Sequence, residues 1–195
     1  MGKIILASSS PRRAEILKKN GYRYEIIPSV YKEPHTQTVF SAKFIEKIAY
    51  NKAKSVIPFV DDKSIIIGAD TMVVIDGEIL GKPRGFDEAF KMLRKLSGRC
   101  HKVVTAIAVI DTGTGLSKCK SVTSEVEFFP LTDIMIEDYI TKFQPYDKAG
   151  SYGIQEMPEG YIKAYRGSLN NIIGLCPETL KKLLECLNYK ERIKN

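Results

Sequence analysis

Short apolar runs alternate along this chain with segments in which apolar residues recur at helical spacing. The first apolar run, residues 4–7, predicts a buried strand, and residues 14–17 begin a helical pattern after the polar loop 8–13. Pro11 suits the first position of that helix, where its missing N–H costs nothing, and Ser10 is a favourable cap before it. The chain therefore opens with a strand, a tight loop and a helix.

A strand and a long helix are predicted next. Residues 22–28 alternate like a strand, and Ser41 caps a helix that extends to about residue 57. Lys52 lies on the apolar stripe of that helix, so its side chain faces inward. It either snorkels to the edge of the core or meets an anion in a cleft, because an unpartnered buried ammonium is costly.

A hairpin follows. The β-branched run 64–69 is typical of a buried strand and ends at Asp70 and Thr71, which predicts a carboxylate at a strand end. A continuing strand reaches the dipeptide 76–77, Asp-Gly, which is a type I′ turn signal. The returning arm should bring Lys82 beside Asp70, since residues equidistant from a tight turn face one another.

The rest of the chain continues the alternation, with neither a low-complexity linker nor an internal repeat, and this predicts an α/β fold. The remaining predicted elements are helices at 87–97 and after Thr132 and Pro177, a hairpin of strands 103–111 and 116–129, a glycine-interrupted loop at 144–156, and a strand at 161–165.

Size and charge narrow the class of protein. With 195 residues and 44% hydrophobic content, the chain fits one domain or two small lobes with a sizeable core. Its apolar runs are too short to span a bilayer, and we expect no signal peptide. The net charge of +7 favours anionic partners. Lys190, Arg192 and Lys194 predict a solvated helix end or frayed terminus, with a nucleic-acid arm as the alternative.

Cysteine and histidine usage limits the chemistry. The four cysteines form no Cys-x-x-Cys pair and lack a histidine at zinc-ligand spacing, which favours a reducing cytoplasm. With only His35 and His101 present, we expect both histidines to be structural or exposed. Any metal should be a hard cation held by carboxylates and phosphates.

The polar residues that face inward or lie on loops form a chemically consistent set. Arginines and lysines neutralise a polyphosphate and its leaving group, while two carboxylates can hold Mg²⁺ or Mn²⁺ and one of them can orient or deprotonate water. Neither a Walker A pattern nor Gly-x-Gly-x-x-Gly occurs, which argues against a P-loop kinase and a Rossmann dehydrogenase. For the opening loop, a capped surface helix with solvated arginines is the alternative. The set is Ser8, Arg12, Arg13, Glu33, Lys52, Asp70 and Lys82.

Seven segments appear in a consistent order and spacing. They are LASSSPRR (6–13), NKA (51–53), GADT (68–71), GKPR (81–84), LRKLSG (93–98), DKAGSYGIQ (147–155) and NNIIGL (170–175). Together they resemble the Maf family of nucleotide pyrophosphatases, over nearly the whole chain. The resemblance implies an elongated, twisted mixed sheet flanked by helices, Maf/ITPase-like, with two lobes around a nucleotide cleft in a single domain over residues 1–195.

The resemblance also implies a reaction. A nucleoside triphosphate would be hydrolysed between its α and β phosphates to the monophosphate and pyrophosphate, with a divalent cation, Mg²⁺ or Mn²⁺. Asp70 would accept the proton of the attacking water, and Glu33 and Asp70 would bind the metal. The residues that match substrate-binding positions are Ser8, Arg12, Arg13, Lys52 and Lys82.

Three positions resemble the family branch of dTTP/UTP pyrophosphatases. This chain has Arg12, Thr71 and Gln155, where the branch similar to 7-methyl-GTP pyrophosphatases has Trp, Gln and Glu. An amide such as that of Gln155 offers both a donor and an acceptor to a pyrimidine edge. The resemblance therefore implies dTTP and UTP as substrates and leaves modified pyrimidine nucleotides open.

Two other functions are considered. The resemblance also includes a role in septum inhibition, so a nucleotide-binding regulator of cell division without turnover is the alternative, although a pure binder needs no water-activating carboxylate. Nucleic-acid binding is disfavoured because the chain lacks a basic stripe interleaved with aromatic residues. The resemblance further implies a homodimer.

Overall fold

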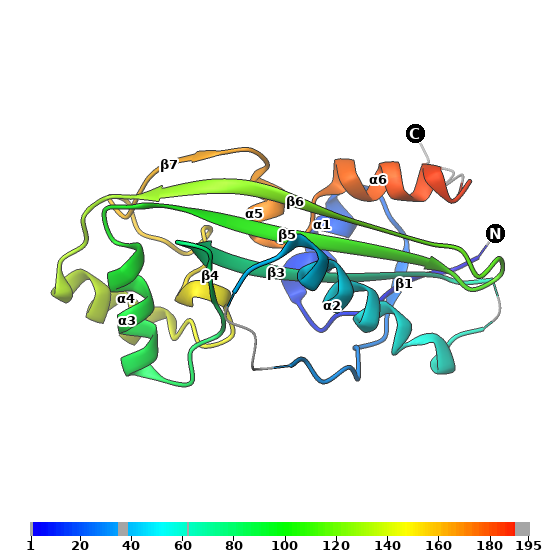
Figure 1. Cartoon of the computed structure of the whole chain (residues 1–195), viewed down its shortest axis with the longest axis horizontal. Coiled ribbons are helices and arrows are strands. Elements are labelled where there is room, and N and C mark those ends of the chain that lie inside the picture. Colours follow the sequence, from blue (N-terminus) through cyan, green and yellow to red (C-terminus); the bar gives the residue numbers. More distant parts are fainter. Residues whose placement is uncertain (1, 35–38, 62, 190–195) are drawn as a thin grey trace.

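The computed structural model describes residues 2–34, 39–61 and 63–189. They form an elongated α/β structure in which three long strands, β3, β5 and β6, extend along the molecule (Figure 1). The strands are β1 (Ile4–Leu6), β2 (Tyr24–Ile26), β3 (Ile65–Ile75), β4 (Glu78–Leu80), β5 (Cys100–Asp111), β6 (Ser117–Phe128) and β7 (Ile162–Arg166). The helices are α1 (Pro11–Lys19), α2 (Ala42–Lys54), α3 (Phe86–Leu96), α4 (Asp133–Phe143), α5 (Leu169–Ile173) and α6 (Pro177–Cys186), with short 3₁₀ turns at Ile57–Phe59 and Ala149–Ser151.

The strands form one mixed sheet in the order β2-β1-β3-β5-β6-β7, with β4 paired to β3. β1 is parallel to β2 and β3, and the remaining pairs are antiparallel. One edge of β3 pairs with β5 from Ile65 to Val74. The other edge pairs with β1 at 65–67 and with β4 at 73–75. Among the described strands, none pairs with that edge at residues 68–72, which we call the open edge.

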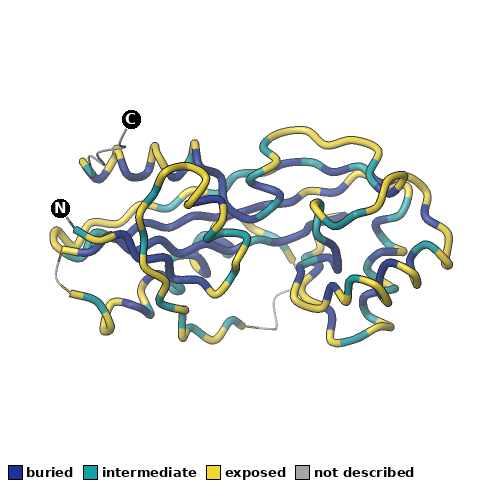
Figure 2. Tube along the Cα trace, turned by 180° about the vertical axis from the view of Figure 1, so that it is seen from behind, coloured by how far each residue is buried: buried dark blue, intermediate teal, exposed yellow. Residues whose placement is uncertain are grey.

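The two faces of β3 serve different cores. Ile65 and Ile67 pack in the core that includes residues of α1 and α6, and Val73, further along the same face, packs with α3 and α4. Ile66 and Met72, on the opposite face, pack against α2. Figure 2 shows the buried residues gathered in the centre of the molecule, where β3 and β5 lie, whereas β6 is mostly exposed or intermediate. Successive side chains of β3 enter different cores because side chains along a strand point alternately to its two faces.

The prediction that Asp70 ends a strand is wrong. β3 continues without interruption from Ile65 to Ile75, and Asp70 pairs with Ala106 and Thr71 with Thr105 in β5. The antiparallel partner therefore carries the ladder through the two polar residues. What opens at Asp70 is one edge of the strand, because β1 has ended and β4 has not begun.

Most other predicted elements are confirmed within one to three residues, and their caps explain where they start. Ser41 and Thr132 each accept a hydrogen bond from the backbone N–H three residues on. Pro11 and Pro177 begin α1 and α6. Ser10 occupies the cap position of α1, but its side chain makes no cap hydrogen bond, contrary to expectation. The short helix α5 was not predicted.

The type I′ turn predicted at 76–77 and the structural role predicted for His101 are both confirmed. Asp76 and Gly77 have φ angles of 54° and 79°, as a type I′ turn requires. His101 is buried, and its Nε2 lies 2.7 Å from the hydroxyl of Tyr152. Burial lowers its pKa to about 4, so it is neutral and structural at neutral pH. His35 and the basic group 190–194 lie outside the described residues.

Gly68 allows α2 to lie unusually close to β3. A Cβ at this position would be 2.3 Å from the carbonyl oxygen of Ala49 and 2.7 Å from the backbone nitrogen of Ala53. These two alanines flank Lys52 on the helix, so the close approach fixes the distance from Lys52 to the sheet.

We expect Gly68→Ala to lower the free energy of unfolding by about 2–3 kcal/mol, because a backbone contact must be pushed apart. Urea denaturation measures the loss. Gly81→Ala is the matched control, since a Cβ there meets nothing within 4 Å, and it should change stability by less than about 0.5 kcal/mol. Equal stability of the two variants would contradict the close-packing argument.

Candidate active site

A cleft of about 1330 Å³ lies at the open edge of β3. Its walls come from the loop before α1, the segment before α2, the hairpin β3–β4 and the loop 147–156. Because one edge of β3 is unpaired here, side chains from both faces of the strand reach the same space. The predicted site residues that line the cleft are Ser8, Arg12, Arg13, Glu33, Lys52, Asp70, Thr71, Lys82 and Gln155.

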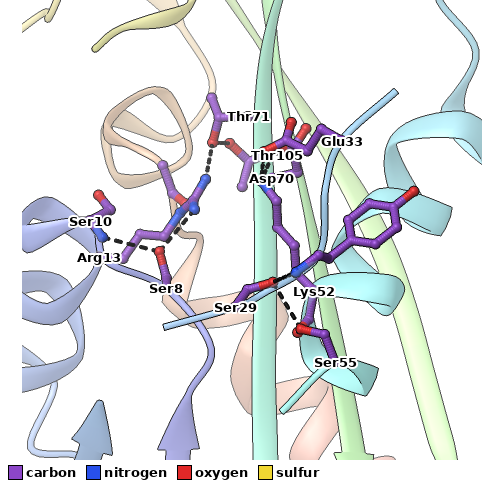
Figure 3. Close-up of polar contacts among 12 residues, drawn as sticks. Ser8, Ser10, Arg13, Ser29, Glu33, Lys52, Ser55, Asp70, Thr71 and Thr105 are labelled. Carbon is purple, nitrogen blue, oxygen red and sulfur yellow. Dashed lines mark hydrogen bonds and ion pairs between the residues drawn. The ribbon is translucent and has the colours of Figure 1, made fainter. Parts of the chain in front are cut away.

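Lys52 joins the two carboxylates of the site. Its Nζ lies 2.6 Å from Asp70 Oδ1 and 2.7 Å from Glu33 Oε1 (Figure 3). The side chains of Lys52 and Asp70 are only 12% and 8% exposed, so the predicted alternative of snorkelling is wrong. Burial opposes ionisation of Glu33, but Lys52, helped by Lys82 and Arg13, holds the pKa of that carboxyl below its usual value.

Arg13 is held by neutral acceptors. Its Nε donates to the carbonyl of Gly174 at 3.0 Å, Nη1 to Ser8 Oγ at 3.2 Å and Nη2 to Thr71 Oγ1 at 3.1 Å. Burial lowers the pKa of Arg13, and Asp70 opposes that shift. Within the described ranges no carboxylate lies at ion-pair distance from it. Three of its five N–H groups are used, which leaves one on each terminal nitrogen for an incoming anion.

Arg12 faces a second group of charges across the cleft. Its Nη1 lies 3.2 Å from Asp147 Oδ2, and the other oxygen of Asp147 lies 2.8 Å from Lys148 Nζ. Lys148 also pairs with Glu156 at 3.0 Å. Burial opposes ionisation of Asp147, but its hydrogen bond with Lys148 and the charges of Lys148 and Arg12 keep its pKa below the usual value. Sequence reasoning gave these three partners no role, although all three lie in or next to the motif at 147–155.

Lys82 and Gln155 are exposed and lie at the rim. The β3–β4 ladder ends with Leu80 opposite Val73, so Lys82 lies past the paired hairpin, in the same cleft as Asp70 but not paired with it. Its charge acts on Glu33, and no ion pair to Lys82 occurs in the described part of the chain. Lys82 thus remains available to a bound anion.

The donor set fits a hard divalent cation. Glu33 and Asp70 provide oxygen ligands, and Mg²⁺ is commonly bound by one or two carboxylates together with substrate phosphates. The residues described contain no group of three or more His, Cys, Asp or Glu that could hold a metal by themselves. A cation here would therefore need oxygen atoms from the substrate or from water to complete its coordination.

No helix in the described ranges is long and apolar enough to cross a bilayer. The thiols of Cys100, Cys119, Cys176 and Cys186 are free, and none contributes to the cleft. The chemistry of the cleft therefore depends on oxygen and nitrogen groups.

Comparison with known proteins agrees with the motif series. The family model described as Maf-like protein matches residues 3–187. The chain is 41% identical to a dTTP/UTP pyrophosphatase of Ruminiclostridium cellulolyticum, covering 97% of this chain and 98% of the relative. It is 43% identical to a dTTP/UTP pyrophosphatase of Alkaliphilus metalliredigens, covering 90% and 91%. With identity of this extent over nearly the full length of both chains, and with the family model spanning both ends of the sheet, the chain belongs to the Maf-like protein family.

Proposed function

We propose that this protein is a nucleoside triphosphate pyrophosphatase that hydrolyses dTTP and UTP between the α and β phosphates. The relatives named above carry that activity in their names. The observation in the structure that supports it best is Arg13, a partly buried cation without a carboxylate partner in the described residues, in the same cleft as the two carboxylates that contact Lys52. A cation held only by neutral acceptors, next to a carboxylate, suits hydrolysis of a phosphate chain.

Each side chain then has a role. Asp70 accepts the proton of the attacking water, and Lys52 orients its carboxylate through the 2.6 Å contact. Arg13 and Lys82, which lack carboxylate partners among the described residues, neutralise the phosphates and the departing pyrophosphate. Ser8 contributes by fixing Nη1 of Arg13. Arg12 can exchange Asp147 for a phosphate oxygen, since both offer anionic acceptors.

Glu33 and Asp70 would hold Mg²⁺ or Mn²⁺, which when bound would neutralise phosphate charge and favour formation of the attacking hydroxide. Lys52 contacts both carboxylates, so it would set how their free oxygens face the substrate. Titration of the purified protein with EDTA should abolish turnover, and Mg²⁺ or Mn²⁺ should restore it.

Three further features complete the proposal. Gln155 at the rim would read the pyrimidine edge through its amide, and Arg12 and Thr71 would contribute to nucleotide choice. Modified pyrimidine nucleotides are additional candidates. The enzyme would act in the cytoplasm as a homodimer, and light scattering of the purified protein tests the dimer.

A nucleotide panel with product identification tests the activity. The protein is incubated with Mg²⁺ or Mn²⁺ and each nucleoside triphosphate, and products are separated by ion-exchange chromatography. We expect dTTP and UTP to give the monophosphate and pyrophosphate. Release of orthophosphate, or tight nucleotide binding without turnover, would contradict the proposal, and the second result would favour the regulatory alternative.

A further inference from the structure

A continuous series of hydroxyl groups leads from Arg13 into the centre of the sheet. Nη2 of Arg13 lies 3.1 Å from Thr71 Oγ1, which lies 2.9 Å from Thr105 Oγ1 on the neighbouring strand β5. Thr105 Oγ1 in turn lies 2.8 Å from the carbonyl oxygen of Asn171 in α5. Figure 3 shows Arg13, Thr71 and Thr105 connected in sequence by dashed lines, with Arg13 and Lys52 on opposite sides of β3.

The direction of each hydrogen bond follows from the number of protons. The Asn171 carbonyl can only accept, so Thr105 must donate its single hydroxyl proton to it. Thr105 can then only accept from Thr71, and Thr71, having donated its own proton, presents only lone pairs to Arg13. Each bond therefore fixes the next, and the guanidinium meets a hydroxyl that cannot turn its proton toward it.

The far end of the series is anchored. Thr105 and Asn171 are both 0% exposed, so water cannot compete for these groups. The side-chain amide nitrogen of Asn171, Nδ2, donates to the backbone carbonyl of Val103 and to Ser124 Oγ. α5 also ends early, because the backbone N–H groups of Gly174 and Leu175 both donate to the carbonyl oxygen of Asn170. That leaves the Asn171 carbonyl for Thr105.

We propose that Thr105 is a positioning residue for Arg13, acting through Thr71, and that it orients the guanidinium toward the phosphates of the substrate. This rests on the proposed function, in which Arg13 binds phosphate. Thr71 then also influences the reaction through its hydrogen bond with Arg13. Thr105 lies outside the motif segments, and its signal in the sequence is a lone hydroxyl within the apolar run 103–110.

The test compares hydroxyl removal with hydroxyl retention. Thr105→Val keeps the shape of the side chain and removes the hydroxyl, whereas Thr105→Ser keeps the hydroxyl. We expect Thr105→Val to lower kcat/KM for dTTP about tenfold, the effect of losing one orienting hydrogen bond, and Thr105→Ser to stay within about twofold of wild type. Thr123→Val, an exposed threonine on β6, controls for hydroxyl loss elsewhere and should leave kcat/KM unchanged.

Introducing Thr105→Val into an Arg13→Met protein distinguishes positioning of Arg13 from a general structural effect. If Thr105 acts through Arg13, Thr105→Val should cause no further loss of kcat/KM in an Arg13→Met protein. A further tenfold loss in that background would overturn the proposal, as would wild-type kcat/KM for Thr105→Val alone.

Folding of the variants is controlled with a second pair. Should Thr105→Val unfold at assay temperature, Thr71→Val and Thr71→Ser interrupt and retain the same series one step nearer to Arg13. The same pattern is required of them, and equal kcat/KM for the two would overturn the proposal. Failure of the proposed function is distinct, because wild-type protein itself would then not release pyrophosphate from dTTP.

Discussion

Asp70→Asn should lower kcat for dTTP by about 10²–10⁴-fold, the usual contribution of a general base, while the fold stays intact. Asparagine keeps an oxygen that can accept from Lys52 at the position where Asp70 Oδ1 lies 2.6 Å from Nζ, so the side chain should keep its place. What it loses is the charge and the ability to take a proton. Steady-state kinetics with pyrophosphate detection measures the effect, and urea denaturation checks the fold.

Asp76→Asn provides a matched control on the same hairpin. Asp76 is exposed, pairs with Arg99 and lies in the type I′ turn, where asparagine is equally suited to a positive φ. Its kcat should remain within about twofold of wild type. If Asp70→Asn retained wild-type turnover, Asp70 would not be the proton acceptor, and the function of the carboxylate–lysine group would need another explanation.

Lys52→Met should have the largest effect on stability among the site variants. It removes the cation that two carboxylates share, and leaves Asp70 8% exposed without its partner. Removing one member of a fully buried ion pair costs ~3–5 kcal/mol; with Glu33 39% exposed, we expect a loss of about 2–3 kcal/mol, together with loss of turnover.

The double variant Lys52→Met/Asp70→Asn separates charge from packing. Because it removes one of the two unpaired carboxylates, it should be more stable than Lys52→Met alone by at least about 1 kcal/mol in urea denaturation. The pKa of Glu33, measured by ¹³C NMR, should rise in Lys52→Met, since Lys52 is the main group that lowers it. Additive stability changes with an unmoved Glu33 pKa would contradict the shared-cation arrangement.

Local patterns predicted the elements well because their signals are local. Caps and prolines fix the starts of α1, α2, α4 and α6, and the Asp-Gly pair fixes the turn after β3. The apolar stripe of α2 correctly predicted that Lys52 faces inward, and contact with an anion was one of its two predicted environments. The family resemblance brought the remaining site residues together, and the structure finds them all around one cleft.

Long-range pairing could not be predicted from one sequence. That Asp70 lies inside a strand depends on β5, whose pairing with β3 no local pattern specifies. Arg12 and Asp147 are 135 residues apart, and Thr71 and Thr105 are 34 apart, so nothing near either partner indicates the contact. The helix α5, only five residues long, depends on its neighbours rather than on an apolar stripe.

The open edge of β3 divides the cleft by residue parity. Even-numbered positions such as Asp70 and Met72 face α2 and the carboxylates, whereas odd-numbered positions such as Thr71 and Val73 face away from α2, toward Arg13 or the α3 and α4 core. A substitution at an even position should therefore alter water activation, and one at an odd position should alter how the phosphate or nucleotide is held. Adjacent residues of one strand thus serve separate parts of the reaction, water activation at position 70 and phosphate binding through Arg13 at position 71.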